Sequence, residues 1–130
     1  MTLIEILDIL NARVLTHPVT LQKTVDNAYC ADLMSDVLSF SITKSLLVTG
    51  LTNAQVIRTA EMAAIEVIIF VQGKRPESQT IRLAEEKHIP LLVTDLSMFD
   101  TCGRLYEKGL RSQVHHLNQS PIETCRTKSL

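Results

Sequence analysis

Apolar residues along the chain alternate between two kinds of pattern. Uninterrupted apolar runs at 46–48, 67–71 and 91–93 are typical of strands that are buried on both faces. Each run is followed by a short polar loop and then by a segment whose apolar residues recur on one helical face. The three helices are expected at about 54–64, 79–88 and 98–108. Strand, loop and helix repeated in this order predict a parallel sheet with helices on both faces.

The first 40 residues carry the same two kinds of signal in shorter form. Thr2 and Glu5 have the spacing of a capping box, which satisfies free amide groups where a helix begins. A short amphipathic helix there is predicted by an apolar stripe at Leu3, Ile6, Leu7 and Leu10. A strand is predicted within 24–31 and a helix within 32–40. Together the elements predict a three-layer α/β/α domain with a mainly parallel sheet of about four to five strands.

Residues at the ends of the predicted helices agree with these boundaries. Asn53 and Ser97 are residue types that accept amide hydrogen bonds at helix starts. Pro76 suits a first helical turn, and Gly109 suits a left-handed helix end.

The length of 130 residues fits one domain. We interpret residues 1–110 as that domain and residues 111–130 as a weakly ordered tail, because the tail has no sustained apolar period. The formal net charge is −1 and aromatic residues make up 4%, so the chain lacks the basic face and stacking platforms of nucleic-acid binders. Its apolar runs are far shorter than the roughly 20 residues that a membrane helix needs. Neither nucleic acid nor membrane is therefore expected as a partner.

The three cysteines, Cys30, Cys102 and Cys125, are odd in number and widely spaced. This spacing is unlike the framework of a disulfide-rich secreted domain, and the N-terminus lacks the basic leader of a signal peptide, so a reducing cytoplasm is expected. No two cysteines form a Cys-x-x-Cys pair, and His115-His116 has only the distant Cys125 nearby, so no metal or other cofactor is predicted. Cys102 and Cys30 are both expected to be buried as small core residues.

Several strings in the chain carry a family resemblance. They are Ala31–Leu38, Leu47–Asn53, Ile68–Lys74, Ile89–Leu92 and Gly103–Tyr106. With this order and spacing, residues 1–110 resemble the DRTGG domain family. The Asp-Arg-Thr-Gly-Gly signature of that family would fall near 22–28, where this chain lacks both glycines.

The resemblance implies a compact α/β module that acts as an accessory or regulatory unit, often at a dimer interface. Members of the family occur alone, beside CBS domains in inorganic pyrophosphatases, and ahead of phosphotransacetylase catalytic domains. Stand-alone members are labelled as relatives of HPr kinase, and some are encoded near iron hydrogenases. A homodimer and a protein partner are therefore expected.

The loops after the predicted strands provide the candidate ligand site. Because the carboxyl ends of parallel strands meet at one edge of the sheet, these loops should lie together there. The candidate ligand-binding residues are Thr49, Gly50, Thr52, Asn53, Gly73, Lys74, Arg75, Thr94, Asp95 and Ser97. Lys74 and Arg75, with amide groups at the helix starts, would suit a phosphate or carboxylate. All ten residues also have an alternative interpretation as helix caps and turn residues.

No catalytic residue is predicted. The segment Thr49–Asn53 follows a strand and opens a helix but lacks the second glycine and the Gly-Lys-Ser/Thr ending of a P-loop, so kinase activity would have no nucleotide cradle. Asp32 and Asp36 would share a helix face at i and i+4 and could hold magnesium. The preferred interpretation is an acidic helix start that complements the helix dipole.

Three functions follow from these observations. The favoured one is a non-catalytic regulatory or assembly module, homodimeric, that binds a small anionic, phosphate-bearing metabolite. The first alternative is a hydrogenase-associated accessory protein that acts only through protein partners. The second is a metal-dependent enzyme on a phosphorylated substrate, with Asp32 and Asp36 as metal ligands and Lys74 as a phosphate clamp.

Overall fold

The computed structural model describes residues 1–40 and 43–112. In the described part, ten elements follow one another along the chain. They are α1 (Leu3–Leu10), β1 (Arg13–Val14), β2 (Asn27–Cys30), α2 (Met34–Ser39), β3 (Ser45–Thr49), α3 (Ala54–Met62), β4 (Ile65–Phe70), α4 (Ser78–Glu86), β5 (Leu91–Val93) and α5 (Met98–Glu107).

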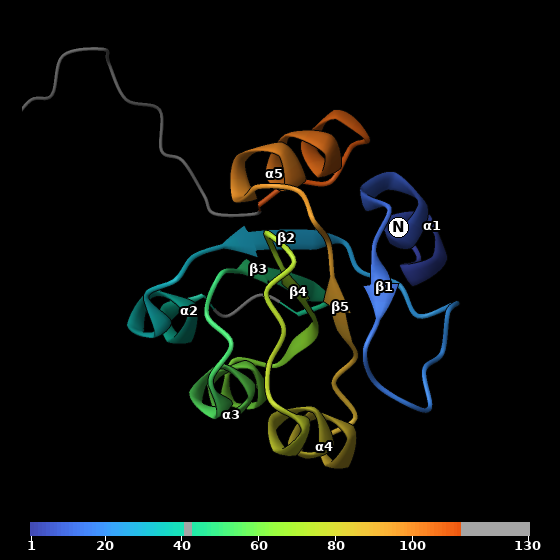
Figure 1. Ribbon diagram of the computed structural model, residues 1–130. Helices are drawn as coiled ribbons and strands as arrows, with labels where there is room; N and C mark the ends of the chain where they lie inside the picture. Colours follow the sequence, from blue (N-terminus) through green and yellow to red (C-terminus); the bar gives the residue numbers. More distant parts are fainter. Residues whose placement is uncertain (41–42, 113–130) are drawn as a thin grey trace, which may run out of the picture.

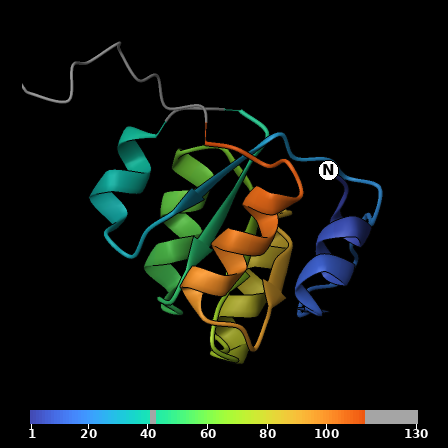
Figure 2. The same ribbon diagram turned by 90° about the horizontal axis from the view of Figure 1, so that it is seen from above.

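The strands form one five-stranded sheet in the order β1-β5-β4-β3-β2. Strands β2 to β5 are parallel neighbours, and β1 pairs antiparallel with β5. Helices α1 and α5 cover one face of this sheet, and α2, α3 and α4 cover the other (Figures 1 and 2). The predicted three-layer α/β/α fold with a mainly parallel sheet is thus confirmed.

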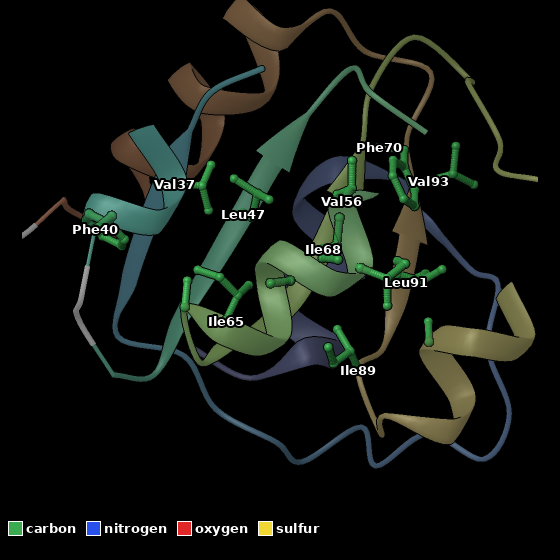
Figure 3. Close-up of a cluster of buried hydrophobic side chains, with 14 residues drawn as sticks. Val37, Phe40, Leu47, Val56, Ile65, Ile68, Phe70, Ile89, Leu91 and Val93 are labelled. Carbon is green, nitrogen blue, oxygen red and sulfur yellow. The ribbon is translucent and has the colours of Figure 1, made fainter. Parts of the chain in front are cut away.

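Side chains of the central strands alternate between the two faces, as the pleat of a strand requires. Leu47 and Ile68 belong to the cluster beneath α2, α3 and α4 (Figure 3), whereas Leu46 and Ile69 belong to the cluster beneath α1 and α5. Because both faces are covered, every residue of β3 is buried. This explains why the strand sequences are continuously apolar.

Helix α1 packs on the sheet as its apolar stripe predicts. Leu3, Ile6 and Leu10 are fully buried, and the Thr2 hydroxyl accepts a hydrogen bond from the Glu5 amide while the Glu5 carboxylate accepts one from the Thr2 amide. This capping box lowers the pKa of Glu5, because the hydrogen bond from the Thr2 amide favours its charged form.

Some element ends differ from the expectation. Pro76 lies before the N-cap residue Glu77 and not in the first turn of α4. Ala64 lies beyond α3, in a left-handed turn with φ of 57°, since the chain must reverse immediately into β4. Gly109 has φ of 107° after α5, as predicted for a left-handed helix end.

The prediction that Cys30 is buried is wrong. Cys30 is exposed, because β2 is an edge strand whose last residue lies where the sheet ends. Cys102 is half-buried in α5. Of the predicted tail, only Arg111 and Ser112 are described. The Arg111 carbonyl accepts a hydrogen bond from the Ala28 amide on the outer edge of β2. Residues 113–130, with His115, His116 and Cys125, lie outside the described residues.

Candidate functional site

The loops that follow β2, β3, β4 and β5 leave the sheet at one edge, because these strands are parallel. All ten candidate ligand residues lie at the end of β3 or in the loops after β3, β4 and β5. The parallel strands β2, β3, β4 and β5 lie in chain order along the sheet, and the helices that connect them, α2, α3 and α4, pack on the same face. A reversal of strand order, which opens the usual ligand crevice of α/β sheets, does not occur among the described parallel strands. The carboxyl edge of the sheet therefore offers several small candidate sites and not one large crevice.

At the first of these sites, Asp32 connects the end of β2 to the loop after β3. Its Oδ1 accepts hydrogen bonds from the Thr49 hydroxyl at 2.9 Å and from the Gly50 amide at 2.8 Å. The Thr49 hydroxyl in turn accepts from the Leu51 amide. Asp32 therefore fixes the loop that opens α3.

The prediction that Asp32 belongs to a helix is wrong. The residue precedes Leu33, the N-cap of α2, so Asp32 and Asp36 do not lie on one helix face. Its carboxylate turns toward Gly50 because the amide and hydroxyl donors there need an acceptor. Within the described residues, no group of three or more His, Cys, Asp or Glu side chains is placed to hold a metal ion.

Lys74 approaches the same loop from the segment after β4. A Cβ atom at Gly50 would lie 3.8 Å from Lys74 Nζ and 3.5 Å from Asp32 Oδ2. The missing side chain of Gly50 thus leaves room between an ammonium group and a carboxylate. Among the described residues, neither Lys74 nor Arg75 forms an ion pair or a side-chain hydrogen bond.

Arg75 belongs to a neighbouring open groove of about 450 Å³ between the starts of α3 and α4. The groove is lined by Thr52, Asn53, Ala54, Arg75, Glu77, Gln79 and Thr80. Within the described chain, the Asn53 side chain makes no capping hydrogen bond, so its amide is available to the groove. Thr52, Asn53 and Arg75 are thus brought together in this groove. Gly50 and Lys74 are close to them along the chain but do not line the groove, and lie near Asp32.

The candidate residues near β5 have partners inside the protein. The buried Thr94 hydroxyl donates to the Leu10 carbonyl at 2.8 Å, and Ser97 caps α5 by accepting from the Asp100 amide. Asp95 forms an ion pair with Arg13 at 3.3 Å, and its Oδ1 lies 3.0 Å from where a Gly73 Cβ would be. These contacts fit the alternative interpretation as caps and turn residues.

Within the described residues, no helix has the length and apolar character needed to cross a membrane.

The comparisons with known proteins agree with this architecture. The model of the DRTGG domain family matches residues 5–107. A solved structure of the CBS and DRTGG domains from the regulatory region of Clostridium perfringens pyrophosphatase, in complex with the activator diadenosine tetraphosphate, is similar with a TM-score of 0.60 and 18% identity. The similarity covers 80% of this chain and 45% of that one. No curated protein matches the chain in sequence. Since the family model spans most of the sequence, the chain belongs to the DRTGG domain family.

Proposed function

We propose that this DRTGG domain is a regulatory or assembly module, homodimeric, which binds a small phosphate-bearing anion at the edge formed by the starts of α3 and α4. The observation that carries the proposal is the presence of two cations, Lys74 and Arg75, that lack an ion-pair partner among the described residues. Both are exposed, so a ligand from solvent can reach them.

The starts of α3 and α4 add to this positive charge. Amide groups in the first turn of a helix have no partner within the helix and carry partial positive charge. At α3 the Asn53 side chain makes no capping hydrogen bond within the described part, and only the Val56 amide of the first turn donates to a backbone carbonyl, that of Asn53. Arg75 lies across the same groove. The positive charge of Arg75 and the partial positive charge of the helix starts favour a small anion in this groove of about 450 Å³, which also has Glu77 in its lining.

The acidic residues nearby limit which anions fit. Asp32 lies beside Gly50 and Glu77 lines the groove, so a ligand with phosphate groups along its whole length would meet repulsion. A ligand with phosphate at one part and a polar, uncharged remainder suits the arrangement better. The similar pyrophosphatase region was solved with a phosphate-bearing activator, which supports the same class of ligand.

Isothermal titration calorimetry of the full chain tests the proposal, with diadenosine tetraphosphate, adenosine monophosphate, acetyl phosphate and pyrophosphate as probes. We expect at least one probe to bind, and Lys74→Ala and Arg75→Ala each to weaken it about tenfold, since a charge-assisted hydrogen bond contributes roughly 1.5–3 kcal/mol. Lys108→Ala is the matched control, because Lys108 is an exposed lysine at the end of α5.

The outcomes separate the proposal from its alternatives. Equal loss in the Lys74 and Lys108 variants would mean binding through general surface charge. Absence of heat for every probe would leave the protein-partner function as the better account.

A further inference from the structure

Two cysteines that are 72 positions apart in the sequence lie together where β2 ends beneath α5. The Sγ atom of Cys30, the last residue of β2, is 2.6 Å from the Sγ atom of Cys102 in α5. Both are free thiols in the structure. Because a disulfide joins its sulfur atoms at about 2.0 Å, a small adjustment of these two side chains would bring them to bonding distance.

Small molecules can reach this pair from solvent. Cys30 is exposed and Cys102 is half-buried. Both line an apolar pocket of about 130 Å³ that Tyr106, Leu110 and Arg111 complete. The pocket leaves room beside the sulfur atoms for a small thiol reagent.

The pair also has unequal acidities. The pKa of Cys102 is lowered because its thiolate accepts a hydrogen bond from the Cys30 thiol. The pKa of Cys30 is raised by the same hydrogen bond, and partial desolvation of its sulfur beside α5 raises it further. The hydrogen bond between the two sulfur atoms therefore favours a thiolate in the pair, which is the form that attacks a disulfide.

We propose that Cys30 and Cys102 are a redox modification site that forms a reversible intramolecular disulfide by exchange with a low-molecular-weight disulfide. The Cys102 thiolate attacks one sulfur of the small disulfide, whose S–S bond breaks and releases one thiolate. Cys30 then loses its proton to that thiolate and attacks Cys102 Sγ, which releases the second small thiolate. The proton that Cys102 gave up to become a thiolate returns to this second product. The two protein thiols are oxidised to one disulfide, and the small disulfide is reduced to two thiols.

The bond would join the edge strand β2 to the helix α5 and would close the loop between two cysteines that are 72 positions apart. Closing so long a loop restricts the unfolded chain, so oxidation is expected to raise the melting temperature by roughly 10 °C. The proposal does not depend on the anion site, because neither cysteine lies among the candidate ligand residues.

A thiol count after exposure to oxidised glutathione tests the inference in the full chain. The sequence contains three cysteines, so Cys125→Ser leaves only the pair. We expect the count in this variant to fall from two thiols to none, the mass to fall by two hydrogen atoms without added glutathione, and dithiothreitol to restore both thiols. Peptide mapping of the oxidised wild-type protein should then recover Cys30 linked to Cys102.

Two double variants are the controls, Cys30→Ser with Cys125→Ser and Cys102→Ser with Cys125→Ser. Each retains one thiol and should gain one glutathione in place of the internal bond. The inference is overturned if the Cys125→Ser variant keeps both thiols, carries two glutathiones, or forms a bond between two chains on a non-reducing gel.

Discussion

At the scale of single residues, Asp32 is the side chain that holds the candidate site in shape. It accepts two hydrogen bonds, from the Thr49 hydroxyl and the Gly50 amide. Asp32→Ala should lower the free energy of unfolding by roughly 1–2 kcal/mol, because both donors lose their acceptor. Asp32→Asn should cost less, since its amide oxygen can still accept. Urea denaturation measures both changes.

Asp36→Ala is the control for Asp32, because Asp36 is an exposed residue in the first turn of α2. A change within about 0.5 kcal/mol is expected there, as for most surface substitutions. If the two alanine variants lost the same stability, the special role of Asp32 would be wrong. Magnesium should stabilise neither the wild-type protein nor the variants, in contrast with the expectation for a metal-dependent enzyme.

The sequence alone predicted the positions of some of these residues but not the contacts between their side chains. The loops after the strands could be located because apolar runs end abruptly at Thr49 and Thr94. The contact between Asp32 and Gly50, and that between Cys30 and Cys102, depend on strand order and on where α5 crosses the sheet. Neither is encoded in local spacing, so cysteines 72 positions apart could only be interpreted separately.

At the scale of elements, the caps of α3 and α5 offer a direct comparison. Ser97 makes the predicted capping hydrogen bond, whereas Asn53 makes none within the described residues. Ser97→Ala should therefore cost about 1 kcal/mol of stability, and Asn53→Ala distinctly less. Thermal denaturation followed by circular dichroism measures the difference. Equal losses of stability in the two variants would show that the Asn53 side chain also caps α3 in solution. It would then not be available to a ligand in the proposed groove.

The elements that periodicity predicted were those long enough to show a period. The three strand–helix units of residues 45–107 were located to within a few residues. Strand β1 was missed because two residues, Arg13 and Val14, have no periodicity of their own. They become a strand only because β5 would otherwise have an open edge, which β1 covers through antiparallel pairs to Val93 and Leu92.

At the scale of the whole molecule, the winding of the sheet decides which surfaces remain for partners. Helices α2, α3 and α4 share one face, and α1 with α5 share the other. The apolar stripe of α1 is used to cover the sheet, so it does not supply a dimer seam. The start of α5 is more suitable, because Phe99 there is 85% exposed. An exposed aromatic side chain on a helix is typical of protein interfaces.

Sedimentation of the full chain tests whether α5 forms the proposed homodimer. We expect the wild-type protein to sediment as a dimer and Phe99→Glu to sediment as a monomer, because two carboxylates would be buried at the seam without partners. Leu33→Glu is the matched control, since Leu33 is an exposed apolar residue at the N-cap of α2. A dimer lost only in the Leu33 variant would move the seam to α2, and a monomeric wild-type protein would contradict the homodimer itself. Neither substitution changes a residue that lines the groove at α3 and α4, so anion binding that survives in the monomer would show that each chain carries a complete site.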